Sequence, residues 1–118
     1  VIGHPDDGRY KLDYDELAKQ AAKYKVALEL NNSSLHPDSA RQGGRENIVK
    51  LLNACKKHGA YVLCGTDAHI CYDIGVFDYA KEIIKETDFP KELILNKSLD
   101  GLNYVLNDTK YTSALFAK

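Results

Sequence analysis

The stretch Tyr61-Val62-Leu63-Cys64-Gly65-Thr66-Asp67-Ala68-His69 sets the organisation of this chain. Its first four residues predict a buried strand. Asp67 and His69 follow that strand and are two positions apart, so in extended backbone their side chains point the same way. A carboxylate and an imidazole placed in this manner can hold metal ions or share a proton.

The N-terminus has the same pattern. Val1-Ile2-Gly3 is typical of the end of a strand, and His4 follows it directly. His4 is either a metal ligand or a loop imidazole bonded to the backbone. As a ligand, it would be oriented by the carboxylate of Asp6 or Asp7. Two strand ends with His and Asp indicate that one end of a sheet is a chemical site.

Strands and helices alternate along the rest of the chain. Asp13 is typical of a helix N-cap, and Glu16 completes a pattern similar to a capping box. The sequence predicts strands over residues 26–30, 61–64 and 93–96, and helices over 13–24, 45–57 and 75–86, with a last helix capped by Ser98. The expected apolar faces of the three later helices consist of Ile48, Leu51, Leu52 and Cys55; of Val76, Ala80, Ile83 and Ile84; and of Leu102, Val105 and Leu106.

This alternation predicts an α/β fold, in which parallel strands form a sheet covered by helices. Sites in such sheets form at the C-terminal ends of the strands. His4, Asn31 and Asp67 each lie just past a predicted strand, so we expect these three residues at one edge. After Asn107, Tyr111, Leu115 and Phe116 offer apolar side chains that could dock the tail.

Three further positions have two interpretations each. Glu29 lies in an apolar strand and is either a partner of the site or a satisfied structural carboxylate. Asn31 and the three polar residues after it bind substrate or tie the loop 31–44 together. Arg45, near a helix start, grips a phosphate or is an exposed surface residue. His36 and His58 are interpreted as surface residues.

Composition excludes several classes of function. The chain has 118 residues, enough for one domain, and a net charge of -1 without a basic patch, so nucleic acid is not an expected partner. No apolar run approaches the roughly 20 residues of a membrane helix, and no secretory signal is present, which predicts a cytoplasmic protein without a membrane partner. Three cysteines argue against a disulfide framework.

The chain has no Met and begins inside a predicted strand, so we expect a fragment of a longer protein.

Four short segments together resemble one family. They are Gly3-His4-Pro5-Asp6, Leu28-Glu29-Leu30-Asn31-Asn32-Ser33-Ser34, Gly44-Arg45-Glu46-Asn47 and Thr66-Asp67-Ala68-His69. Their order and spacing resemble the last part of the PHP (polymerase and histidinol phosphatase) family, in its branch of standalone YcdX-like hydrolases. The resemblance extends to about Asn107, so residues 1–118 would be the C-terminal portion of a PHP domain.

The resemblance implies a distorted TIM-like barrel of seven βα units with up to three Zn or Mn ions at its C-terminal face. His4, Asp67 and His69 would each bind one ion, and Asp67 and His69 would be catalytic. Arg45 and Asn31 would bind the substrate, a phosphorylated small molecule. The implied reaction is the hydrolysis of a phosphoester, in which metal-bound hydroxide attacks phosphorus.

The chain lacks the family's N-terminal His-x-His pair, its further histidines and its bridging Glu. Three ligands divided among three ions cannot complete their coordination, so we expect this chain alone to be inactive and to bind metal weakly or not at all. Four strands cannot close a barrel, so we also expect self-association through the open sheet edge. The alternative hypothesis is a non-catalytic α/β binding or interaction module.

Overall fold

The computed structural model describes residues 1–107. Its centre is a small parallel sheet of β1 (Leu28–Asn31) and β2 (Val62–Gly65), in which Leu28 is paired with Val62 and Asn31 with Gly65. Single parallel bridges extend the sheet at both edges, from Ile2 to Leu28 and from Val62 to Ile94. The four parallel segments therefore follow one another in space in the same order as in the sequence.

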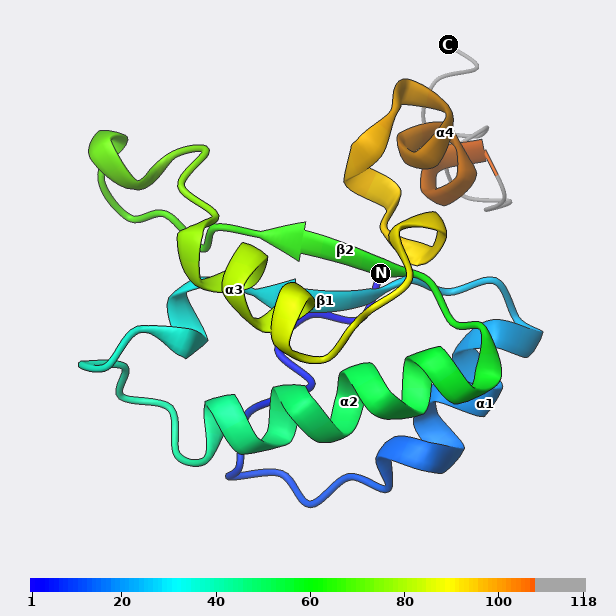
Figure 1. Cartoon of the computed structure of the whole chain (residues 1–118), viewed down its shortest axis with the longest axis horizontal. Coiled ribbons are helices and arrows are strands. Elements are labelled where there is room, and N and C mark those ends of the chain that lie inside the picture. Colours follow the sequence, from blue (N-terminus) through cyan, green and yellow to red (C-terminus); the bar gives the residue numbers. More distant parts are fainter. Residues whose placement is uncertain (108–118) are drawn as a thin grey trace, which may run out of the picture.

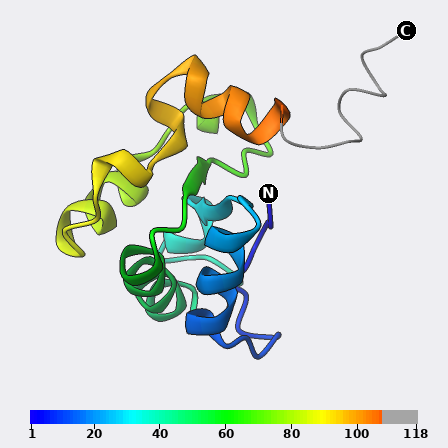
Figure 2. The same ribbon diagram turned by 90° about the vertical axis from the view of Figure 1, so that its right-hand side faces the viewer.

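Helix α1 (Tyr14–Lys23) precedes β1, and helix α2 (Gly44–His58) connects β1 to β2. The two helices lie side by side and pack on the same side of the strands (Figures 1 and 2). The predicted bounds of both agree with the structure to within one residue at each end. The Asp13 carboxylate accepts a hydrogen bond from the Glu16 backbone N–H at 3.1 Å, and Gly59 ends α2 with a left-handed φ of 70°.

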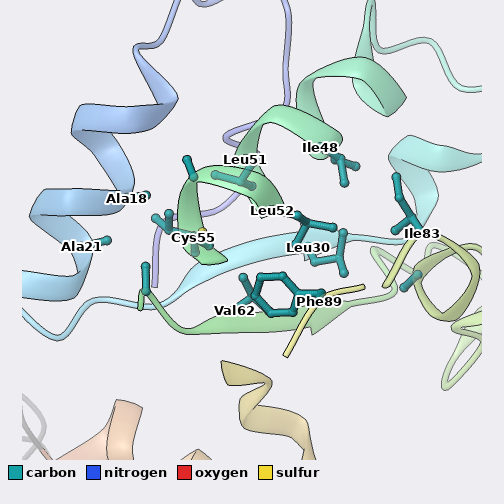
Figure 3. Close-up of a cluster of buried hydrophobic side chains, with 14 of the residues drawn as sticks. Ala18, Ala21, Leu30, Ile48, Leu51, Leu52, Cys55, Val62, Ile83 and Phe89 are labelled. Atoms are coloured by element: carbon teal, nitrogen blue, oxygen red, sulfur yellow. The ribbon is translucent and has the colours of Figure 1, made fainter. Parts of the chain in front are cut away.

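The hydrophobic core lies between the strands and these helices (Figure 3). Leu28, Leu30 and Val62 are fully buried on this face of the sheet. The predicted stripe of α2 faces them, since its four apolar residues Ile48, Leu51, Leu52 and Cys55 are all 0% exposed. Strand alternation places the paired residues Glu29 and Leu63 on the opposite face, where both are partly exposed.

Helix α3 (Asp78–Glu86) adds Ala80 and Ile83 to the same core. The expected start at residue 75 is wrong, because Gly75 has a φ of 78° and Phe77 a φ of −126°, neither of which is helical. Val76 is accordingly outside the helix and 37% exposed.

The predicted strand at 93–96 is also wrong. Two 3-10 turns, Lys91–Leu93 and Leu95–Lys97, replace it, and Ile94 alone forms a bridge to β2. The Asn96 side chain takes over the pairing with β2: its Oδ1 accepts from the Cys64 N–H at 2.7 Å, and its Nδ2 donates to the Cys64 carbonyl at 3.0 Å. A side-chain amide therefore supplies the two hydrogen bonds that a strand backbone would have made.

Helix α4 (Leu99–Asn107) begins as predicted, with the Ser98 hydroxyl accepting from the Gly101 N–H at 3.2 Å. It lies beyond β2, away from α1 and α2 (Figure 1). Its expected apolar face is only partly correct, since Leu102 is 44% exposed. The expected docking of Tyr111, Leu115 and Phe116 lies outside the described residues. Within residues 1–107, none of the helices is both long and apolar enough to cross a bilayer.

Candidate active site

Two residues with strained backbone stand at the C-terminal edge of the sheet. His4 and Asp67 have φ values of 52° and 51°, in the left-handed region that side chains other than glycine seldom adopt. Two other non-glycine residues share this conformation, Lys25 and Asp88, and each directly follows the end of a helix. His4 and Asp67 instead follow strand segments, and strain of this kind clusters at functional sites.

Arg41 brings these two residues to one point. Its Nη2 donates to Asp67 Oδ2 at 2.9 Å and lies 3.4 Å from His4 Nε2. Its Nη1 donates to the Ser34 hydroxyl at 2.5 Å. Arg41 lies in the polar loop 31–44 after β1, and the sequence did not single it out as a site residue. Local spacing in the sequence could not place the Arg41 guanidinium near His4 and Asp67, because its position depends on the conformation of the loop.

Glu29 supports His4 from the open face of the sheet. Glu29 Oε2 accepts from the His4 backbone N–H at 2.8 Å and lies 3.4 Å from His4 Nδ1. Because Arg41 can only donate to His4 Nε2, a neutral His4 ring carries its proton on Nδ1, facing this carboxylate. That arrangement is the one in which a histidine presents Nε2 to a metal. Glu29 is thus a partner of the site, the role that Asp6 and Asp7 were expected to have.

His69 is held by its own loop. Its Nδ1 lies 2.8 Å from the Asp67 backbone carbonyl oxygen. A carbonyl only accepts, so Nδ1 carries the proton and Nε2 keeps a free lone pair. The His69 side chain is exposed, and the structure gives it no contact with His4 or Arg41 among the described residues.

The charge of Asp67 is favoured by its surroundings. Burial raises the pKa of Asp67, but hydrogen bonds from Arg41 and Asn31 and the positive charge of Arg41 outweigh burial, so the pKa lies below its usual range. Asp67 is therefore a carboxylate at neutral pH, which is the form that binds cations.

Asp6 has the opposite environment. It is 0% exposed, and neither of its carboxylate oxygens has a hydrogen-bond partner of ordinary geometry among residues 1–107. Burial raises the pKa of Asp6, and the nearby Ser34 hydroxyl and Arg41 charge offset this only in part. Asp7 is occupied by Arg9, through a bond of 2.5 Å to Nη2. Neither aspartate contacts the His4 ring.

The two residues expected to bind substrate both have partners within the chain. Asn31 is fully buried, its Oδ1 accepts from the Ser34 N–H at 3.0 Å, and its Nδ2 lies 3.2 Å from His4 Nδ1. It therefore ties the start of the loop to the end of β1, beside His4. Arg45 is exposed at the start of α2 and pairs with Glu86 of α3 at 2.5 Å.

A small pocket opens beside Asp67. Its volume is about 180 Å³, and apart from Val76 it is lined by polar or aromatic side chains. Those residues are Asn32, Ser33, His36, Thr66, Asp67, Asp73 and Tyr79. The pocket is thus suited to a compact polar group placed next to the Asp67 carboxylate.

The donors of this site fit a metal ion in chemistry. His4 Nε2, His69 Nε2 and the Asp67 carboxylate are all of the types that Zn²⁺ and Mn²⁺ accept. Across residues 1–107, however, no three His, Cys, Asp or Glu side chains converge as a metal site would require. The described residues by themselves therefore do not form a complete metal site.

The chain is similar to several proteins that are named probable phosphatases. It is 42% identical over 100 residues to one from Caldicellulosiruptor bescii, which covers 85% of this chain and 40% of the relative. It is 40% identical over 96 residues to one from Clostridium novyi and 42% identical over 98 residues to one from Yersinia enterocolitica. These matches cover 81% and 83% of this chain and 38% and 39% of the relatives. The chain thus spans about two fifths of the length of the curated relatives it matches. No family model matches it.

Proposed function

We propose that this chain is the C-terminal part of a metal-dependent phosphoesterase of the PHP type. The observation that carries the proposal is the convergence of His4 and Asp67 on Arg41 at the C-terminal edge of parallel strands. The names of the relatives support phosphatase chemistry. The order of the parallel segments supports a barrel, because they follow the chain order and their connecting helices pack into one core.

In the intact protein, His4, Asp67 and His69 hold divalent ions, with Zn or Mn as the expected metals. Such ions supply Lewis acidity toward phosphoryl oxygen and lower the pKa of water. The chain's own groups prepare this site: Glu29 orients His4, and the Asp67 carbonyl fixes the His69 tautomer. Asp67 and His69 thereby act as the catalytic residues.

Substrate binding falls to Arg41 in this proposal. A guanidinium can hold a phosphate through two parallel hydrogen bonds, and Arg41 is the arginine that reaches Asp67. The pocket of about 180 Å³ beside Asp67 would receive the organic part of a small phosphorylated molecule. Asn31 contributes by holding the loop after β1, and Arg45 by joining α2 to α3.

The test is hydrolysis of a chromogenic phosphate ester by the intact protein, with added Mn²⁺ or Zn²⁺. Asp67→Ala and His69→Ala are expected to lower kcat roughly a hundredfold or more, because each removes a group that stabilises the transition state. His58→Ala is the matched control, since His58 pairs with Asp15 on the helices and lies outside the site.

A non-catalytic α/β module gives a different result. It would show no hydrolysis with any added metal, and a chelator would leave its melting temperature unchanged. That pair of results would refute the proposal.

A further inference from the structure

The Arg41 guanidinium occupies the point where the two strand-end donors meet. Its Nη2 is 2.9 Å from Asp67 Oδ2 and 3.4 Å from His4 Nε2. The side chains of Arg41 and Asp67 are only 20% and 23% exposed, so this contact is largely shielded from water. A positive charge of the protein itself thus neutralises the candidate ligand group.

These contacts use the same lone pairs that a cation needs. The lone pair of His4 Nε2 faces Arg41, and a histidine nitrogen has one lone pair to give. Asp67 has more acceptor capacity, but a guanidinium and a metal ion beside the same oxygens repel each other as like charges. A cation bound to His4 and Asp67 and Arg41 in its present position therefore disfavour each other.

We infer that Arg41 and a divalent cation compete for His4 and Asp67, and that cation binding releases Arg41 toward the phosphate of the substrate. The inference rests on the proposed function, since it concerns the same site. It adds a regulatory coupling: cation and phosphate favour each other's binding because both displace Arg41 from Asp67.

The surroundings of Arg41 permit this release. Its Nη1 bond to the Ser34 hydroxyl anchors the side chain when Nη2 leaves Asp67. A second pocket of about 470 Å³ borders Arg41 on the side of the loop, where Ser34, Ser39 and Gly43 also line it. Nη2 can therefore turn away from Asp67 while the guanidinium stays beside the site, ready to pair with an anion.

The experiment measures the Mn²⁺ affinity of the intact protein directly, by the electron paramagnetic resonance signal of free Mn²⁺. Arg41→Met keeps an unbranched, flexible side chain but removes the guanidinium and its charge. We expect it to bind Mn²⁺ on the order of threefold to tenfold more tightly than the wild type. Lys50→Met is the matched control, because it changes the net charge equally and lies in the exposed Glu46 ion pair on α2. It should leave the affinity unchanged.

Inorganic phosphate provides the second arm. Saturating phosphate should tighten Mn²⁺ binding of the wild type, and Arg41→Met should lose most of this coupling, because linkage between two ligands is reciprocal. Equal Mn²⁺ affinity in the wild type and Arg41→Met, or weaker binding in Arg41→Met, would overturn the inference.

Asp67→Asn separates this failure from that of the proposed function. If Asp67→Asn weakens Mn²⁺ binding while Arg41→Met has no effect, the metal site stands and the competition is refuted. If Asp67→Asn binds Mn²⁺ as well as the wild type, or no variant binds it, the proposed metal site fails and the inference fails with it.

Discussion

At the residue scale, Asp7 and Arg9 form a compact pair next to the site. Asp7 Oδ1 accepts from both the backbone N–H and Nε of Arg9 at 3.0 Å. These bonds lower the pKa of Asp7 to about 2. The folded pKa lies below the ordinary value, so ionised Asp7 stabilises the fold above about pH 4, and this contribution disappears as the pH falls toward 2.

Asp7→Asn should therefore lower the melting temperature most at neutral pH, and the difference from the wild type should shrink between about pH 4 and about pH 2. Thermal unfolding followed by circular dichroism at several pH values measures it. Asp38→Asn, at a side chain that is 93% exposed, serves as the control and should have little effect at any pH. A constant difference for Asp7→Asn across the whole range would contradict the assignment.

The sequence identified the positions of the candidate site better than their partners. His4 and Asp67 were found because a strand end followed by a polar residue is a local pattern. The roles of Glu29 and Arg41 depend on contacts across 25 and 26 residues, to His4 and Asp67 respectively. Nothing in local spacing reports such contacts, which explains why Arg41 was not singled out and why two interpretations of Glu29 stayed open.

At the scale of the elements, α1 depends on its cap. Asp13 satisfies the Glu16 N–H, one of the unpaired donors of the first turn. Asp13→Ala should lower the free energy of unfolding by about 1 kcal/mol, measured by urea denaturation. Asp13→Ser keeps a capping oxygen and should retain most of the stability. Equal losses for the two variants would show that capping is not the cause.

The junction between β2 and the following turns depends on Asn96. Asn96→Ala removes both hydrogen bonds to Cys64 and should cost about 1 to 2 kcal/mol in the free energy of unfolding. Amide exchange of Cys64 should become faster, because its N–H loses its acceptor. Asn96→Asp keeps an acceptor for that N–H but loses the donor, so its amide protection should be intermediate. Unchanged exchange in Asn96→Ala would rule out this role.

The hydrophobic periodicity of the sequence predicted the type of an element correctly where that element packs on the core. The α2 stripe was predicted because four apolar residues at helical spacing meet a buried sheet, and it is fully buried. The segment 93–96 has the apolar composition of a strand, but the 3-10 turns on either side of Ile94 leave only that residue to pair with β2. Either the Asn96 side-chain amide or a strand backbone could have paired with Cys64. Tertiary contacts decide between them, and the composition of the segment does not show these contacts.

At the scale of the whole molecule, one face and two edges of the sheet are incompletely covered. Ile2 at one edge is 39% exposed and Val1 is 56% exposed. The loop after Asp67 also exposes large apolar side chains, at Ile70, Tyr72 and Ile74. Apolar surface and free backbone at a sheet edge favour association with another chain.

We predict that the 118-residue chain self-associates. Light scattering should give a mass that rises with protein concentration, and Ile2→Lys should reduce this rise, because a charge at an edge strand opposes pairing. Glu82→Gln, on the exposed side of α3, changes the net charge by the same amount and is the control. A single monomeric mass at high concentration would contradict the prediction.

The left-handed backbone at His4 and Asp67 has a consequence for how this protein tolerates mutation. Glycine adopts that conformation without penalty, so His4→Gly or Asp67→Gly relieves on the order of 1 kcal/mol of backbone strain, which offsets the loss of the side-chain contacts. A variant library selected only for resistance to proteolysis should therefore enrich glycine or asparagine at both positions. A library selected for catalysis should keep histidine and aspartate at these positions. The difference between the two libraries would identify the residues needed for catalysis, and it requires no knowledge of the natural substrate.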